Sequence, residues 1–85
     1  MDIEFDPAKD EANLAKHGVS LAAAADFEIH VVVRDDRHAY DEDRFNAFGV
    51  LWGRFYCLTF SRRNGRFRAI SLRRAHAKEY RGHVI

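Results

Sequence analysis

The amino-acid sequence predicts an α+β fold: an antiparallel β-sheet meander packed on two N-terminal helices, with a short C-terminal helix. Two observations lead to this class. Helix-capping residues bracket alanine-containing segments before residue 28, whereas the second half of the chain alternates β-type segments with tight-turn signals. A chain of 85 residues buries only about 60 to 65% of its unfolded surface, too little for two cores. We therefore expect one domain spanning residues 1–85.

The N-terminal part contains signals for a strand and two helices. Residues 2–5 alternate polar and apolar side chains, as a short half-buried strand does. Asp6-Pro7 is an N-cap followed by proline at the first helical position, and Gly18 is the expected residue after a helix end, so a helix is predicted over 7–17. Ser20 is the cap of a second predicted helix, which runs through four alanines to Phe27.

The rest of the chain is predicted to be mostly β-structure. The expected strands are residues 30–34, 44–52, 54–62 and 66–74, with a polar loop or hairpin start at 35–43 and a short helix across the sheet at 75–83. Gly53 separates two of these strands, and Asn64-Gly65 is a strong signal for a type I′ turn. Both parities of 44–52, Trp52 included, and of 54–62 are largely apolar, which predicts burial on both faces.

The charges are divided by position along the chain. Residues 1–43 carry twelve Asp and Glu against four Lys and Arg, a net charge of −8, whereas residues 44–85 carry one against ten, a net charge of +9. Nine of those ten cations are Arg, whose planar guanidinium suits bidentate contact with phosphate or carboxylate. The alternative is that these arginines pair with the acidic half of the same molecule on a solvated face.

The composition disfavours several classes of protein. No apolar run approaches the roughly 20 residues that cross a bilayer, and the N-terminus is acidic where a signal peptide would be basic, so we expect a cytoplasmic protein without membrane contact. Cys57, the only cysteine, lies in an apolar run and is expected to be buried. There is no HExxH string, Cys/His quartet or glycine-rich phosphate loop, so we expect neither a metal nor another cofactor.

The last predicted strand holds two alternative clusters of polar residues. Strict alternation places Arg68 with Arg74 on one face and Ser71 with Arg73 on the other. The pattern does not decide which of these lines a site. A strand end that is merely solvated is an equally good interpretation.

Two helix ends carry further candidates. His17 closes the first helix beside Lys16, where the negative end of the helix dipole favours cations, although a simple capping role explains it as well. The terminal segment holds candidate acids, bases and phosphate donors, namely His76, Lys78, Glu79, Tyr80, Arg81 and His83. Arginines also alternate with aromatic residues at 54–56 and 66–68, as in proteins that stack unpaired bases, and core packing explains these aromatics equally well.

Two strings, taken together and in this order, resemble the BrnT toxin family. They are Asn13-Leu-Ala-Lys16-His17-Gly18 after Asp6-Pro7, and Ile70-Ser71-Leu-Arg73-Arg74-Ala75 before Glu79-Tyr80. The likeness covers nearly the whole chain. It implies a RelE-like α+β ribonuclease of a bacterial type II toxin–antitoxin system, which stops translation by cleaving RNA. It also implies a BrnA-type antitoxin with a ribbon-helix-helix domain, through which the complex binds operator DNA.

The resemblance also implies where the chemistry lies. The helix-end Lys-His of the family corresponds to Lys16 and His17, and its final-strand motif and downstream acid correspond to Ser71, Arg73, Arg74 and Glu79. With Arg68 added, the candidate catalytic residues are His17, Arg68, Ser71, Arg73, Arg74 and Glu79. The candidate RNA-binding residues are Lys16, Arg44, Arg54, Arg62, Arg66, Lys78 and Tyr80.

The leading hypothesis is metal-independent cleavage of RNA, free or on the ribosome, by attack of a 2′-hydroxyl on the adjacent phosphate. Arg68, Arg73 or Arg74 would stabilise the phosphorane. Glu79 or His17 would accept the proton, and His76, Lys16 or Tyr80 would protonate the leaving oxygen. Two alternatives remain: a non-catalytic nucleic-acid-binding module, and a surface that docks an acidic antitoxin segment.

Overall fold

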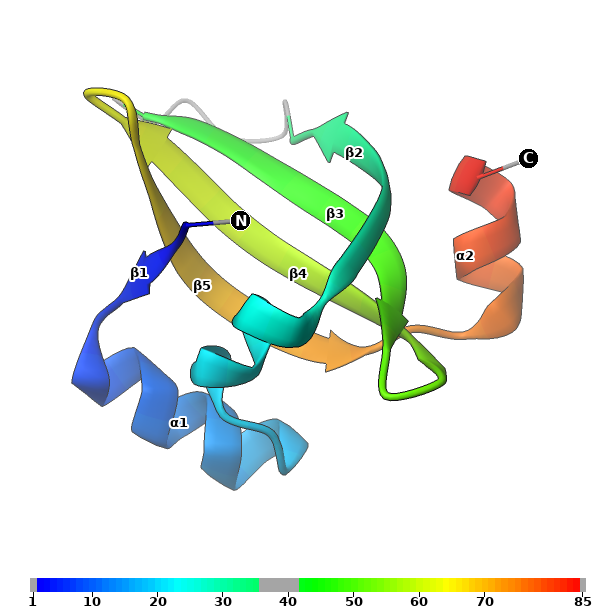
Figure 1. The fold of residues 1–85 in the computed structure, drawn as a ribbon, viewed down its shortest axis with the longest axis horizontal. Coiled ribbons are helices and arrows are strands. Elements are labelled where there is room, and N and C mark those ends of the chain that lie inside the picture. Colours follow the sequence, from blue (N-terminus) through cyan, green and yellow to red (C-terminus); the bar gives the residue numbers. More distant parts are fainter. Residues whose placement is uncertain (1, 36–41, 85) are drawn as a thin grey trace.

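The computed structural model describes residues 2–35 and 42–84 (Figure 1). In chain order, its elements are β1 (Glu4–Phe5), α1 (Pro7–His17), the 3₁₀ helix η1 (Leu21–Asp26), β2 (Glu28–Arg34), β3 (Asp43–Leu51), β4 (Arg54–Arg63), β5 (Arg66–Arg74) and α2 (Ala77–Val84). The strands form one sheet in the order β1-β5-β4-β3-β2. Most of the loop predicted at residues 35–43 lies outside the described residues.

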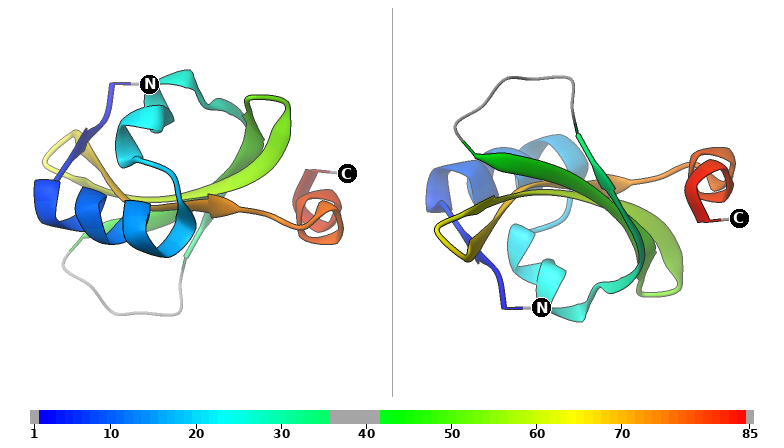
Figure 2. Two further views of the ribbon diagram at one scale, coloured as in Figure 1. Left: turned by 90° about the horizontal axis from the view of Figure 1, so that it is seen from below. Right: turned by 90° about the horizontal axis from the view of Figure 1, so that it is seen from above.

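The predicted fold class is wrong in two respects, and the RelE-like meander implied by the resemblance is corrected with it. The sheet is mixed, because β1 pairs in parallel with β5 through Glu4↔Arg68 and Phe5↔Ala69, while the other neighbours are antiparallel. Only one of the two predicted N-terminal helices is an α-helix. The α-helices α1 and α2 therefore belong to the two ends of the chain and lie at opposite ends of the molecule (Figure 2).

The second predicted helix is η1, whose length explains its tighter form. Ser20 caps it by accepting a hydrogen bond from the N–H of Ala22 at 3.1 Å, and Phe27 is already extended at φ −78° and ψ 125°. The carboxylate of Asp10 on α1 also holds the start of η1, accepting from Ser20 Oγ and from the N–H of Leu21, both at 2.7 Å. Seven residues are left between the cap and β2, and six of them form a short 3₁₀ segment, as is common in connections.

Other local predictions are confirmed. Asp6 caps α1 by accepting from the N–H of Ala8 at 2.8 Å, and Gly18 ends it in the left-handed region at φ 73°. Asn64 and Gly65 have φ values of 54° and 76°, as a two-residue type I′ turn requires. The burial predicted for Trp52 is wrong. Strand β3 ends at Leu51, and Trp52 occupies the next turn with 65% of its surface exposed.

Two hydrophobic clusters lie on opposite faces of the sheet. The larger packs β3, β4 and β5 against η1 and the preceding Val19, with Leu21, Leu51, Leu58, Phe60 and Leu72 among its buried members. The smaller lies under α2 and contains Phe48, Cys57 and Ala75. These clusters confirm that the central strands are buried on both faces. Burial raises the pKa of the Cys57 thiol, as expected of an unreactive cysteine.

Strand β2 approaches β3 so closely at one point that only glycine fits. A Cβ on Gly49 would lie 1.9 Å from the carbonyl oxygen of Glu28. The register of β2 also shifts between Ile29 and Val31, which leaves His30 in a β-bulge. None of the described helices is long and apolar enough to cross a membrane.

Candidate functional site

A β-bulge in β5 decides which polar residues share a face. Ser71 pairs with Thr59, but Ala69 pairs with Phe60, so Ile70 has no partner across the strand. This extra residue shifts the alternation, and the strict alternation predicted for this strand is therefore wrong. Arg68 lies on the same face as Ser71 and Arg73, instead of sharing a face with Arg74.

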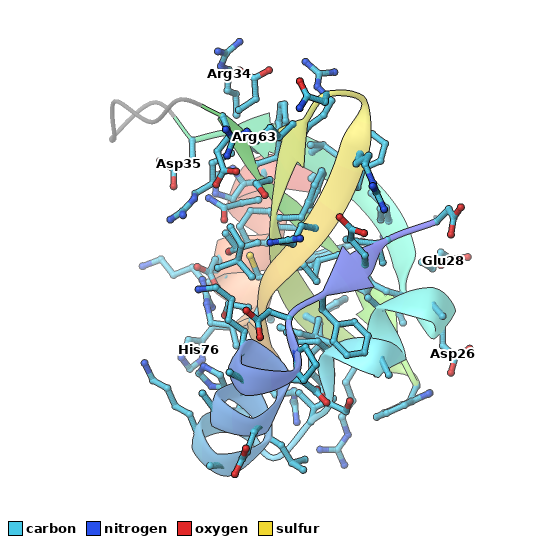
Figure 3. The ribbon with its side chains drawn as sticks, turned by 90° about the vertical axis from the view of Figure 1, so that its left-hand side faces the viewer. Asp26, Glu28, Arg34, Asp35, Arg63 and His76 are labelled. Atoms are coloured by element: carbon cyan, nitrogen blue, oxygen red, sulfur yellow. The ribbon has the colours of Figure 1, made fainter. Side chains whose placement is uncertain are left out.

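We call the resulting surface the polar face. Its residues on the three central strands are Arg44, Asn46, Thr59, Ser61, Arg63, Arg66, Arg68, Ser71 and Arg73, which the strand registers place on one side of the sheet. Figure 3 shows the sheet from the side, with Arg63 and His76 to one side of it and Asp26 and Glu28 to the other. The three central strands therefore present these five arginines to one side, with hydroxyl and amide side chains between them.

The C-terminal end of α1 borders the polar face at Ser71. Lys16, His17 and Ser71 line one surface hollow, together with Lys9, Asn13 and Ile70. Ser71 and His17 are half-buried, whereas Lys16 is exposed. The structure thus brings together two candidates from α1 and one from β5, which are more than fifty positions apart in the sequence.

Asn13 fixes α1 in this position. Its side chain is 5% exposed, and its Nδ2 donates to the carbonyl oxygens of Val19 and Leu72, both at 2.9 Å. The N–H of Leu72 donates to Asn13 Oδ1 at 3.0 Å. These bonds occupy the edge of β5 beyond the point where β1 stops pairing with it. Since Leu72 follows Ser71 directly, Asn13 also sets the distance from the end of α1 to Ser71.

Arg73 and Glu79 form a bidentate pair at the other end of the polar face. Arg73 Nη1 and Nη2 donate to Glu79 Oε1 and Oε2, both at 3.0 Å, and Nη1 also lies 3.2 Å from the carbonyl oxygen of Arg74. The hydrogen bond from Arg73 lowers the pKa of the Glu79 carboxyl and raises that of Arg73 itself. Glu79 is therefore a weak proton acceptor that orients the guanidinium, and it also ties α2 to β5.

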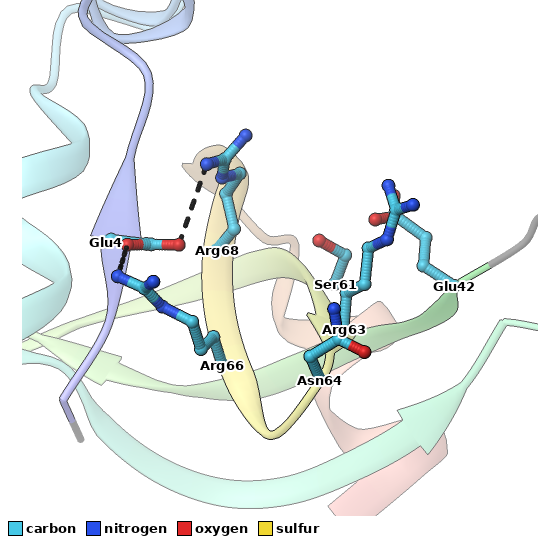
Figure 4. Close-up of a pocket in the computed structure, with 7 residues that line it drawn as sticks. All are labelled: Glu4, Glu42, Ser61, Arg63, Asn64, Arg66 and Arg68. Atoms are coloured by element: carbon cyan, nitrogen blue, oxygen red, sulfur yellow. Dashed lines mark hydrogen bonds and ion pairs between the residues drawn. The ribbon is translucent and has the colours of Figure 1, made fainter.

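Glu4 on β1 binds two arginines of the polar face (Figure 4). Its carboxylate lies 2.9 Å from Arg66 Nη2 and 3.6 Å from Arg68 Nη2, beside a hollow that Ser61 and Arg63 also line. The interpretation that arginines pair with the acidic half of the chain is thus correct for some of the arginines, among them Arg66 and Arg68. Arg66 and Arg68 remain exposed, so a phosphate could still reach them.

Three other candidates lie away from the polar face. Arg74 faces the opposite side, with its guanidinium carbon 5.8 Å from the centre of the Tyr56 ring. Arg62 also faces that side, and its Nη2 lies 2.9 Å from the Asp43 carboxylate. The hydrogen bond from Arg62, together with the charge of Arg34, lowers the pKa of the Asp43 carboxyl. Arg54 is exposed beside the β3–β4 turn.

Tyr80 attaches α2 to the sheet. Its ring stacks on Phe55 with centroids 4.1 Å apart, and its hydroxyl is hydrogen-bonded to His30 Nδ1. His30 Nε2 lies 2.8 Å from the carboxylate of Glu28, which can only accept, so Nε2 carries a hydrogen, and in the neutral imidazole Nδ1 then accepts from the Tyr80 hydroxyl. Of the two RNA-binding candidates on α2, Tyr80 thus has a structural role, and Lys78 is exposed.

Sequence reasoning missed several residues that build the site. Asn13 began one of the two family strings but was given no role, and Glu4 and the bonded pair Thr59–Asn46, with its oxygens 2.7 Å apart, were not singled out. Asn13 was visible as the one amide on the apolar side of a capped helix, but nothing local marks the other three. Among the described residues, no group of three or more His, Cys, Asp or Glu is arranged to hold a metal ion.

Together, these features define a small mixed-sheet α+β protein whose arginine-bearing face, bordered by Lys16 and His17, suits a phosphate backbone. A comparison with protein families gives the particular assignment. Residues 5–79 match the family described as "Ribonuclease toxin, BrnT, of type II toxin-antitoxin system", and the chain belongs to this family. A search of the curated proteins found no match. The resemblance inferred from the two sequence strings is thereby confirmed, and membership implies an antitoxin partner.

Proposed function

We propose that this chain cleaves RNA at the polar face without a metal ion, by attack of a 2′-hydroxyl on the neighbouring phosphorus. The observation that carries the proposal is that Arg68, Ser71 and Arg73 share one face, with Lys16 and His17 beside Ser71. Family membership supports ribonuclease activity in general. The specific reaction follows from the kinds of side chain that meet here, because cations can replace a metal ion in neutralising the extra charge of a phosphorane.

Arg73 has the geometry expected of the group that stabilises this charge. Glu79 holds two of its N–H donors in one plane, and its side chain is still 37% exposed. A guanidinium has five N–H donors, so three remain for other partners, one of them directed at the carbonyl oxygen of Arg74. Arg68 would bind a second phosphate oxygen after moving away from Glu4, which it contacts at 3.6 Å.

His17 is the better of the two proposed bases. Glu79 is bound to Arg73 and its pKa is lowered, so it holds a proton poorly near neutral pH. His17 is half-buried in the hollow beside Ser71 and has no competing carboxylate partner among the described residues. It would take the 2′-hydroxyl proton, and Lys16 would donate a proton to the departing 5′-oxygen, giving a 2′,3′-cyclic phosphate and a 5′-hydroxyl end.

The biological setting is proposed from the family resemblance. Cleavage of RNA, free or on translating ribosomes, would stop translation in the cytoplasm. A BrnA-type antitoxin with a ribbon-helix-helix domain would neutralise the toxin, and the complex would bind operator DNA through the antitoxin. Arg66, Arg68 and Arg73 already bind the carboxylates of Glu4 and Glu79, so an acidic antitoxin segment would compete with RNA for the same N–H donors.

The test is cleavage of a defined RNA by purified protein, with and without a chelator and with and without translating ribosomes. The expected products carry 2′,3′-cyclic phosphate and 5′-hydroxyl ends in the presence of chelator, and His17→Ala should slow their formation on the order of 100-fold or more. Lys9→Ala, which removes a neighbouring cation of the same hollow, is the matched control. Ends that carry 5′-phosphate, or activity that disappears with chelator, would refute the mechanism, and retention of RNA without products would favour the binding module.

A further inference from the structure

The two hairpin turns of the sheet have the same backbone shape but very different residues. In the β4–β5 turn, Asn64 and Gly65 have φ values of 54° and 76°, and in the β3–β4 turn, Trp52 and Gly53 have φ values of 52° and 78°. Asn is one of the few residues that tolerates this left-handed region, whereas a bulky side chain there is a genuine outlier. The chain therefore places tryptophan where its own second turn has the expected residue.

Folding of the isolated molecule gains little from Trp52. Its backbone is strained, and 65% of its surface is exposed, the largest exposed fraction among the large hydrophobic residues that the structure describes. Neither hydrophobic cluster includes it. Backbone strain persists in proteins mainly where it serves function, so the benefit of this side chain is expected in a contact with another molecule.

The surroundings of Trp52 favour a nucleic acid over a protein. Arg54 follows the turn directly and is exposed, and Arg74 at the end of β5 pairs with Tyr56, two residues further along β4. Strand β5 ends beside this hairpin, where the N–H of Ala75 donates to the carbonyl oxygen of Phe55 at 2.9 Å. Glu28 lies across the strands opposite Val50, and its carboxylate is bonded to His30. An exposed aromatic ring with two arginines nearby suits an unpaired base and its flanking phosphates.

We propose that Trp52 is a stacking platform for one unpaired base of the RNA, with Arg54 and Arg74 binding the adjacent phosphates. The proposal rests on the proposed function, since it assumes an RNA substrate. Arg54 lies about 10 Å along β4 from Cys57, the partner of Arg73. The platform would thus hold the RNA at a nucleotide outside the reacting ones. It also gives a role to Arg54 and Arg74, which do not reach the polar face.

The chain contains a single tryptophan, so its fluorescence reports on this position alone. The probe is a short all-deoxy oligonucleotide of mixed sequence, which has no 2′-hydroxyl and is not cleaved by the proposed reaction. We expect it to quench the tryptophan emission of the wild-type protein. We also expect Trp52→Asn to bind a labelled copy about tenfold more weakly, whereas Trp52→Phe, which keeps an aromatic face, should lose much less affinity.

Stability should move in the opposite direction from binding. Trp52→Asn gives the turn the residue found at Asn64, and we expect its Tm to rise by about 4 °C. The control is Val32→Thr, which changes an exposed apolar residue elsewhere, on β2, and should leave oligonucleotide affinity unchanged. A fall in Tm for Trp52→Asn would refute the claim that the tryptophan is strained.

The outcomes separate this proposal from the proposed function. If the wild-type protein cleaves RNA and binds the oligonucleotide, but emission is unchanged and Trp52→Asn binds equally well, only the stacking platform is refuted. If emission responds to the antitoxin and not to the oligonucleotide, Trp52 is a protein contact and this proposal is again overturned. If the wild-type protein neither binds nor cleaves, the proposed function itself fails.

Discussion

Replacement of Asn13 by alanine should strongly destabilise the protein, because this side chain satisfies three buried backbone groups. The substitution removes the partners of the Val19 carbonyl and of both the N–H and the carbonyl of Leu72. Leu72 is completely buried and Val19 is 4% exposed, so little water is available as a substitute. At the low end, about 1 kcal/mol for each orphaned group gives a loss of about 3 kcal/mol. A domain of this size has about 4 to 13 kcal/mol in total.

The assay is urea unfolding at pH 7, with the slope of the transition checked for constancy. Asn46→Ala, which removes one half-buried bond to Thr59, is the control and should cost about 1 kcal/mol. Asn13→Asp keeps the acceptor for Leu72 but turns a carboxylate toward two carbonyl oxygens, so it should be at least as damaging as alanine. Protonation restores one donor, so the loss for this variant should shrink as pH falls. An Asn13→Ala variant no less stable than Asn46→Ala would refute the role assigned to Asn13.

Three further predictions concern other contacts. Gly49→Ala should cost about 1 to 3 kcal/mol in thermal unfolding, because its Cβ would lie 1.9 Å from the carbonyl oxygen of Glu28, and an unchanged Tm would contradict this close approach. Arg73 lowers the pKa of Glu79, so the stabilisation by this carboxylate, about 1 kcal/mol, should be present above pH 4.5 and disappear as pH falls below it. Glu79→Gln should then differ from the wild type at pH 7 but not in acid, and a difference independent of pH would exclude the ion pair as its cause. Tyr80→Phe removes the hydroxyl bonded to His30 and should speed amide hydrogen exchange in α2 more than in α1. Exchange in α2 that is no faster than in the wild type would show that this bond does not anchor the helix.

Local signals gave much of the secondary structure correctly. Asp6, Pro7 and Gly18 specify α1 through capping and backbone preference, and Asn64-Gly65 specifies a turn through its tolerance of positive φ. These effects act within a few residues and can be read from the sequence. The pairing of β1 with β5 and the shortening of the second helix to η1 depend on contacts between distant segments, such as Asp10 with Leu21, which no local pattern encodes.

The sequence pointed to some residues of the candidate site but not to their arrangement. The family strings pointed to Lys16, His17, Ser71 and Arg73, which do lie on or beside one face. Alternation alone could not combine Arg68 with Ser71, because the bulge at Ile70 inserts one residue without any glycine or proline to mark it. The sequence also did not show the contact between Glu79 and Arg73. Glu79 was one of two candidate proton acceptors, and its bidentate contact instead positions the guanidinium of Arg73.

The most direct test of the central claim compares two neighbouring arginines that point to opposite faces of the sheet. Arg73→Ala and Arg74→Ala are compared by the single-turnover rate of RNA cleavage at saturating protein, after thermal unfolding has shown that both variants are folded. The polar face predicts a rate about 100- to 1000-fold lower for Arg73→Ala and nearly unchanged for Arg74→Ala, whose loss should be in affinity. Equal losses of rate, or a larger loss for Arg74→Ala, would contradict the assignment of the reaction to the polar face.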